Sequence, residues 1–244
     1  MNPVQLIGVE GLPEVRPEDD LGRLIAEHTS LQSGDVIVVA QKVVSKSEGR
    51  TVRLEDVTAG PEAIKIAPRL VAKPDPRMVQ VVLDESVRVL RAERVLITET
   101  RHGYVCANAG VDHSNVGHGV LTLLPLDPDD SARRLCERLR ELTHVEVGVI
   151  VSDTFGRPWR LGIVNVALGV AGTAALIDLR GTPDDAGEPL HATVIAVADE
   201  IAAAAGLVMR KTARTPAVVV RGLSSAGAGS GRELIRPPGE DLFR

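Results

Sequence analysis

The stretch Gly34-Asp35-Val36-Ile37-Val38-Val39-Ala40 decides the fold class of this 244-residue chain. Five apolar residues without a polar interruption predict a strand that is buried on both faces, and Gly34-Asp35 opens it. Upstream, an apolar pattern with helical spacing follows Asp20, which predicts a helix over 21–28 with an acidic start. The fold therefore contains at least one fully buried strand with helices close by.

The rest of the chain mixes helices with further strands. Helices are predicted over 77–85, from an N-cap at Ser131 to 142, and over 199–209. Strands are predicted at 94–100 and 104–107, as a hairpin around His102-Gly103, and then at 145–151, 193–197 and 217–220. These strands outnumber what a strictly alternating βαβ order would give, so we expect an α+β fold with mixed and antiparallel sheets. Residues 1–244 form one unit that could hold two interleaved sub-domains, with a Gly-, Ser- and Pro-rich tail at 224–244.

The composition excludes several classes of protein. The chain is 44% apolar and 25% charged, as globular domains usually are, and its net charge of −5 argues against a nucleic-acid partner. The apolar runs are too short to cross a bilayer and no signal peptide is recognisable, so we expect a cytoplasmic protein without a membrane partner. Cys106 and Cys136 are too few for a disulfide framework and are expected to be free thiols.

Two short acidic segments carry the clearest signs of chemistry. The first is Asp112-His113-Ser114-Asn115, and the second is Asp153-Thr154-Phe155-Gly156-Arg157, which is expected to form a loop after the strand at 145–151. Carboxylate and hydroxyl oxygens of this kind bind Mg²⁺ or Mn²⁺, which share their coordination with water and nucleotide phosphates. The alternatives are an Asx turn at Asp112 and a helix N-cap at Asp153.

Basic residues accompany both segments. Arg157 and Arg160 follow Asp153 and could neutralise charge on a transferring phosphoryl group. Lys42 and Lys46 follow the buried strand in a context rich in Ser and Gly, which suits contact with a phosphate, although lysines at a strand end are usually just solvated. The P-loop pattern G-x-x-x-x-G-K-[ST] does not occur.

Five motifs, in this order, resemble one known family. They are Gly11-Leu12-Pro13-Glu14, Val43-Val44-Ser45-Lys46-Ser47-Glu48-Gly49-Arg50, Asn108-Ala109-Gly110-Val111-Asp112-His113-Ser114-Asn115-Val116, Asp153-Thr154-Phe155-Gly156-Arg157 and Val197-Ala198-Asp199-Glu200-Ile201-Ala202. Each motif alone is weak, but together they span about 8–222. On these residues the chain resembles the coenzyme F-420-0:L-glutamate ligases, in the form without a C-terminal oxidoreductase domain.

The resemblance implies a family-specific ligase fold that forms an intertwined homodimer. It also implies an acid–amino-acid ligase with the small-molecule substrates GTP, L-glutamate and the deazaflavin coenzyme F-420-0. A carboxylate would be activated as an acyl phosphate with Mg²⁺ or Mn²⁺ (and K⁺ as a further cation), releasing GDP. Carried over by position, the metal ligands are Asp112, Asp153 and Thr154, and the GTP contacts are Leu12, Pro13, Glu14, Val15, Gln41, Lys46 and Asn115. Lys46, Arg157 and Arg160 are the expected catalytic residues.

Two departures from the family pattern keep alternatives open. Met209-Arg210-Lys211-Thr212 stands where some relatives place a further metal ligand, and Asp184-Asp185-Ala186-Gly187 stands where relatives commonly carry an aromatic residue. A paralogous amide ligase with another acceptor is therefore one alternative. A nucleotide-binding regulator without catalysis is the other.

Overall fold

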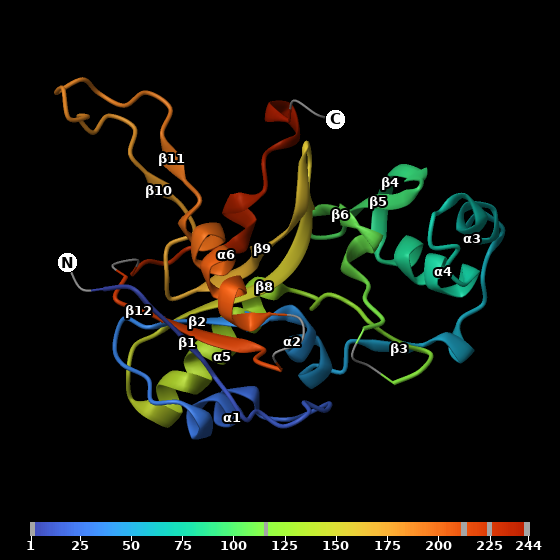
Figure 1. Cartoon of the computed structure of the whole chain (residues 1–244), viewed down its shortest axis with the longest axis horizontal. Coiled ribbons are helices and arrows are strands. Elements are labelled where there is room, and N and C mark those ends of the chain that lie inside the picture. The colour runs from blue at the N-terminus through green and yellow to red at the C-terminus, as the bar shows by residue number, and fades with distance from the viewer. Residues whose placement is uncertain (1–2, 115–116, 211–213, 224–225, 242–244) are drawn as a thin grey trace.

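A mixed five-stranded sheet organises the larger part of the molecule (Figure 1). The computed structural model describes residues 3–114, 117–210, 214–223 and 226–241. The strand order is β1 (Gln5–Gly8), β12 (Ala217–Arg221), β2 (Val36–Ala40), β8 (Gly148–Arg157) and β9 (Arg160–Ala171). Only β2 and β8 run parallel in this sheet, and the other neighbours are antiparallel. The predicted α+β class with mixed and antiparallel sheets is confirmed.

Helices cover both faces of this sheet because its central strands alternate between two cores. Ile37 and Val39 face α1 (Leu21–His28) and α5 (Pro128–Thr143), whereas Val36 and Val38 face α6 (Val197–Met209). This follows from the period of two along a strand, and it accounts for the unbroken apolar run from 36 to 40. Figure 1 shows α6 on one side of the sheet and α1 and α5 on the other.

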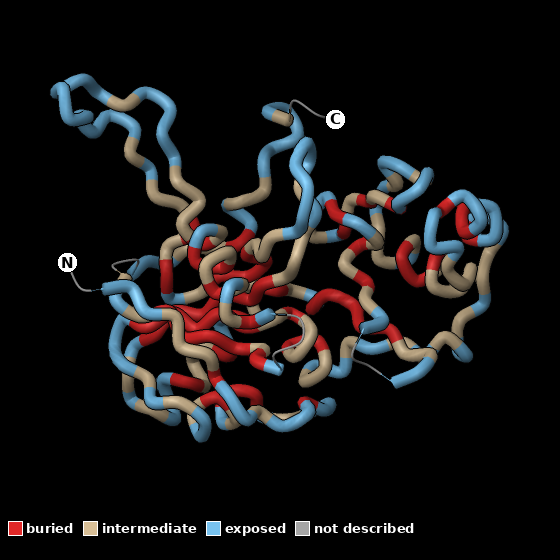
Figure 2. Tube along the Cα trace, viewed as in Figure 1, coloured by how far each residue is buried: buried red, intermediate tan, exposed pale blue. Residues whose placement is uncertain are grey.

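A second core lies beside the sheet, within residues 52–123. This core contains α3 (Pro61–Ile66), α4 (Pro76–Asp84) and an antiparallel sheet in the order β4 (Ser86–Glu93), β5 (Val95–Thr100) and β6 (Val105–Ala107). It is connected to the first core by α2 (Gln41–Ser47) and by the strand pair β3 (Thr51–Arg53) and β7 (Val120–Thr122). Figure 2 shows its buried residues as a separate group. Arg50 joins the two parts, because its guanidinium lies 2.8 Å from Glu85 and donates to the Leu124 carbonyl at 3.0 Å.

Most predicted elements occur where the pattern placed them. The helix after Asp20, the strand at 36–40, the helix near 77–85 and the strand near 217–220 are confirmed as α1, β2, α4 and β12. The hairpin of β5 and β6 is confirmed as well. Cys106 and Cys136 are free cysteines, the first buried and the second half-buried. In the described part of the chain, no helix has the length and apolar character needed to cross a membrane.

Three element boundaries differ from the prediction. The expected loop at 153–157 is wrong, because β8 continues through it and pairs with β9 as far as Arg157 opposite Arg160. α5 begins at Pro128 and is capped by Asp127, whose carboxylate accepts from the backbone N–H groups of Asp129 and Asp130 at 3.1 Å. Ser131 lies inside that helix. α6 begins at Val197 rather than 199, so β11 (Val194–Ile195) is only two residues long.

One segment extends away from the body of the molecule, and part of the C-terminal tail packs against it. Residues 179–193 extend as a mostly exposed arm beyond the short pair β10 (Ile177–Asp178) and β11, at the upper left of Figures 1 and 2. Part of the tail instead packs on β9, because Gly231 is buried and a Cβ there would meet the Leu168 carbonyl oxygen at 1.9 Å. Only glycine permits this close approach of two backbones.

Candidate functional site

The parallel register of β2 and β8 brings two predicted site segments to one edge of the sheet. Ala40 is the partner of Ser152, α2 begins directly after Ala40, and Asp153 directly follows Ser152. The helix that carries Lys42 and Lys46 therefore starts beside the strand that carries Asp153. Ligand sites in α/β sheets often form at such carboxyl ends, where loops and helices converge.

The first acidic segment meets α2 through a lysine. The Lys42 ammonium lies 2.5 Å from Asp112 Oδ2, and it donates to Ser114 Oγ at 2.6 Å and to the Ser114 carbonyl at 2.8 Å. The Ser114 N–H donates to Asp112 Oδ1 at 2.8 Å, so the Asx turn that was the alternative interpretation is present. Burial alone would raise the pKa of Asp112, but the hydrogen bonds from Lys42 and Ser114 lower it overall. Asp112 is held as a carboxylate.

The second acidic segment lies near β6, the strand that precedes the first. Burial raises the pKa of Cys106 to about 12, and the charge of Asp153 contributes in the same direction. Cys106 lies on β6, which leads through a single 3₁₀ turn (Asn108–Gly110) to Asp112. Thr154 Oγ1 donates to Asn165 Oδ1 at 3.2 Å, which commits its proton and leaves its lone pairs for a cation. Asp153 and Thr154 therefore lie on the part of β8 near β6, and β6 leads to Asp112.

The predicted nucleotide contacts lie on α2 and in the segment before α1. The Lys46 ammonium is ion-paired with Glu14, and its side chain is only 12% exposed. Gln41 is buried and its Oε1 accepts from Ser45 Oγ at 2.9 Å. Leu12 and Val15 pack into the first core, and Pro13 is exposed between them. Asn115 lies outside the described residues. Lys211, in the segment where a further metal ligand was considered, lies outside them as well.

The two predicted catalytic arginines lie farther along the β8–β9 hairpin than Asp153. Arg157 is four residues beyond Asp153 on β8, which is roughly 13 Å at the rise of an extended strand. Arg157 donates to the Leu161 carbonyl, and Arg160 is exposed at the tip of the β8–β9 hairpin. This tip also carries Trp159 and Leu161, which are 87% and 96% exposed. The structure thus places Arg157 and Arg160 at the hairpin tip, away from Asp153 along the strand.

The oxygen donors at this edge suit a small divalent cation. In the described part of the chain, no three His, Cys, Asp or Glu side chains converge as a ready-made cluster. Mg²⁺ does not need one, because it usually binds one or two carboxylates and completes its shell with water and phosphate oxygens. The positively charged Lys42 ammonium is bound by the carboxylate, hydroxyl and carbonyl oxygens of Asp112 and Ser114, which are the kinds of oxygen that would bind a metal cation. The donor set fits Mg²⁺ or Mn²⁺.

Polar residues that the motifs did not single out also lie around this edge. Ser152 Oγ is buried and has no hydrogen-bond partner within the described ranges, and Asp199 Oδ1 accepts from the Ala167 N–H at 2.8 Å. Burial raises the pKa of Asp199 despite that bond. Ser152 and Ala167 are register partners, which places Asp199 next to the same part of β8 and β9. Only the fold reveals these neighbours, because their local sequences are ordinary strand and helix.

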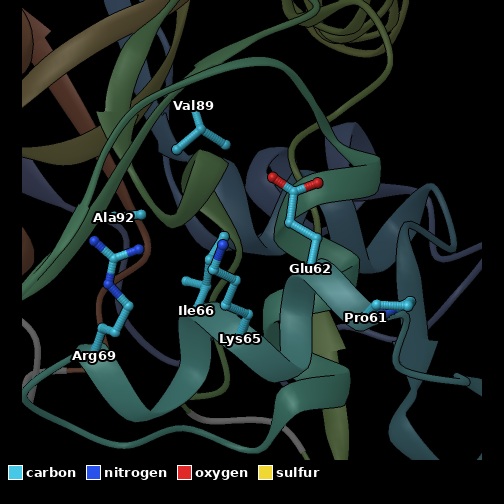
Figure 3. A pocket seen from close by; sticks show the side chains of 7 residues that line it. All are labelled: Pro61, Glu62, Lys65, Ile66, Arg69, Val89 and Ala92. Atoms are coloured by element: carbon cyan, nitrogen blue, oxygen red, sulfur yellow. The ribbon is translucent and has the colours of Figure 1, made fainter.

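An open pocket elsewhere is not part of this site. It lies between α3 and β4, with Ile66 and Val89 in its lining and Arg69 at one side (Figure 3). Arg69 is ion-paired with Glu93 at 2.9 Å, and the described residues that line the pocket include none of the predicted site residues. The predicted site residues that the structure describes therefore lie outside this pocket.

Comparison with known proteins identifies the family. A family model described as F420-0:Gamma-glutamyl ligase matches residues 11–222. The chain is 45% identical to "Coenzyme F420:L-glutamate ligase" of Methanothermobacter thermautotrophicus, over 99% of both chains, and 45% identical to the protein of the same name from Methanopyrus kandleri, over 100% of both. The protein of that name from Archaeoglobus fulgidus is 47% identical over 99% of this chain and 96% of its own length. The chain belongs to the F420-0:gamma-glutamyl ligase family.

Proposed function

We propose that this protein is a GTP-dependent ligase that joins L-glutamate to coenzyme F-420-0 through an amide bond and then adds γ-linked glutamates. The near full-length similarity to proteins named coenzyme F420:L-glutamate ligase supports the ligase activity. Two structural observations support the rest of the proposal: the register of β2 and β8 starts α2, which carries Lys42 and Lys46, beside the end of the strand that continues into Asp153, and Lys42 is ion-paired with Asp112. Carboxylates and ammonium groups at one edge suit a metal–nucleotide site.

The proposed chemistry assigns a role to each group. A carboxylate oxygen of the coenzyme attacks the γ-phosphorus of GTP, the bond to the β-phosphate oxygen breaks and GDP leaves. The amine of glutamate then attacks the acyl carbon of the resulting acyl phosphate, releases inorganic phosphate and loses a proton. Asp112, Asp153 and Thr154 would hold Mg²⁺ or Mn²⁺, which would neutralise phosphate charge. Lys46 would bind phosphate and leave Glu14.

Homodimerisation is part of the proposal. The tip of the β8–β9 hairpin exposes Trp159, Leu161 and Ile163, with Ile163 at 56%. A group of exposed apolar side chains is typical of a protein–protein contact. A partner chain that covers this tip would also bring its own site close to Arg157 and Arg160, which lie at the tip. We therefore propose that Arg157 and Arg160 stabilise the acyl-phosphate step of the partner chain, from across the dimer interface.

The activity can be tested directly. The protein is incubated with GTP, Mn²⁺, L-glutamate and unglutamylated coenzyme, and the products are followed by mass spectrometry and phosphate release. We expect a mono-glutamyl product with one GDP and one phosphate per amide bond, and no reaction when the coenzyme is omitted. Phosphate release with another carboxylate but not with the coenzyme would favour a paralogous ligase. GTP binding without turnover for any acceptor would indicate a regulator instead.

A further inference from the structure

Lys42 occupies the place at Asp112 that a cation would take. All three N–H donors of its ammonium find oxygens, at 2.5 Å on Asp112 Oδ2, 2.6 Å on Ser114 Oγ and 2.8 Å on the Ser114 carbonyl. Its side chain is 19% exposed and that of Asp112 is 35% exposed, so the pair is partly withdrawn from water. A divalent cation at Asp112 Oδ2 would meet this ammonium at close range, so the two positive charges compete for the same carboxylate.

Lys46 offers an internal comparison one turn later on the same helix. Its ammonium is also mostly buried and ion-paired, but its partner is Glu14, which precedes α1 and is not a proposed metal ligand. The two lysines therefore share a helix, a charge and a degree of burial. They differ in their partners: Lys42 is paired with Asp112, a proposed metal ligand, and Lys46 is paired with Glu14, which is not one.

We infer that Lys42 is an exchangeable counter-ion: it neutralises Asp112 in the ligand-free protein, and the divalent metal displaces it toward the nucleotide phosphates. This inference rests on the proposed function, since it requires a metal at Asp112. Displacing the ammonium costs free energy when no phosphate is present, and the cost is offset when the freed ammonium finds one. Lys42 thereby couples metal binding to nucleotide binding, which makes the metal bind weakly until the nucleotide arrives.

The test measures binding rather than turnover. Mn²⁺ affinity is measured by titration calorimetry and by electron paramagnetic resonance of free Mn²⁺, without and with GDP, for the wild type and for Lys42→Met. Without nucleotide we expect Lys42→Met to bind Mn²⁺ about tenfold more tightly, because the competing charge is gone. With Mn²⁺ present we expect it to bind GDP about tenfold more weakly, because a phosphate contact is lost. The ratio of Mn²⁺ affinities with and without GDP should therefore fall.

Three further variants make the outcome decisive. Lys46→Met should weaken GDP binding without tightening Mn²⁺ binding, and Lys42→Arg, which keeps the charge, should bind Mn²⁺ alone as weakly as the wild type. If Asp112→Asn weakens Mn²⁺ binding but Lys42→Met leaves it unchanged, the role of Lys42 is refuted and the metal site stands. If the wild type binds no Mn²⁺ with or without GDP, or Asp112→Asn has no effect, the proposed metal site fails and the inference falls with it. Thermal melts confirm folding, and Lys42→Gln replaces Lys42→Met if the latter does not fold.

Discussion

Asp153 stands on the parallel strand pair at the centre of the proposed site, and its charge is the most direct target for mutation. Asp153→Asn keeps the size of the side chain and removes one metal-ligating charge. We expect kcat/KM for glutamate ligation to fall roughly 100-fold or more, while the free energy of unfolding changes by less than about 1 kcal/mol. Ligation assays and urea unfolding measure the two quantities. Asp56→Asn, on an exposed 3₁₀ turn, is the matched control; a variant at 153 that unfolds instead of losing activity would indicate a structural role.

Asp112 makes stability depend on pH in a definite direction. Hydrogen bonds from Lys42 and Ser114 hold its pKa below the ordinary 3.8. A carboxyl group with a lowered folded pKa stabilises the protein fully above its unfolded pKa and loses that contribution as the pH falls through its folded pKa. We therefore expect the difference in unfolding free energy between the wild type and Asp112→Asn to be greatest above about pH 5 and to shrink below about pH 4. Urea unfolding across this range measures it, and a difference that stays constant or grows on acidification would contradict the ion pair.

Individual site residues could be predicted from the sequence only where a motif carried them. Asp112 and Asp153 stood out because a carboxylate lies beside hydroxyl side chains, and the structure places Asp153 near β6, which leads to Asp112. The ion-pair partner of Asp112 could not be predicted from the sequence, because Lys42 is 70 residues away and only the folded structure brings the two together. Ser152 and Asp199 were missed for the same reason, since their neighbours are set by strand register rather than by local spacing.

At the scale of elements, the first turn of α5 anchors the C-terminal segment. Asp129 Oδ1 accepts from the Val170 N–H at 2.9 Å and from the Gly231 N–H at 2.6 Å, and its Oδ2 accepts from Ser230 Oγ at 2.6 Å. We expect Asp129→Ala to lower the free energy of unfolding by about 3 kcal/mol, because several charge-assisted hydrogen bonds are lost and two backbone N–H groups lose their acceptor.

The adjacent residue supplies the control for that element. Asp130 lies on the same turn but pairs with Arg133 and Arg134 at the surface, at 2.5 Å and 3.4 Å. Exposed pairs contribute little, so Asp130→Ala should cost less than about 1 kcal/mol. Urea unfolding of both variants decides the matter. Equal losses for the two substitutions would mean that the contacts of Asp129 with the tail and β9 do not stabilise the fold.

The type of an element could be predicted where its sequence followed one clear hydrophobic pattern. The predicted boundaries of an element were wrong where contacts with distant residues set its ends. The apolar run at 36–40 and the amphipathic spacing after Asp20 gave β2 and α1. β8 runs past Ser152 because β9 pairs with it, and no local pattern in Phe155-Gly156-Arg157 indicates that pairing. α5 starts early because Asp127 and Pro128 form its cap and first position, while Ser131 imitates a cap inside the first turn.

At the scale of the whole molecule, the exposed hairpin tip makes oligomerisation testable. Leu161→Glu places a charge in the proposed interface of a symmetric dimer, where it appears twice. Burial of a leucine is worth about 2 kcal/mol, so the dissociation constant should rise about 100-fold or more. Sedimentation or light scattering measures the mass, and the single Trp159 reports burial through its fluorescence. Val71→Glu, at a surface side chain that is 70% exposed, is the control. A wild type that is monomeric at all concentrations would refute the dimer.

The central claim is that the two acidic segments form one metal–nucleotide site at the edge of β2 and β8. A crystal structure of the protein with GDP and Mn²⁺, with anomalous diffraction collected to locate manganese, tests it most directly. We expect manganese within bonding distance of Asp112, Asp153 and the Thr154 hydroxyl, with the GDP phosphates beside it and the ammonium of Lys46 on a phosphate. Manganese and GDP bound elsewhere, with Asp112 still paired to Lys42, would contradict the claim.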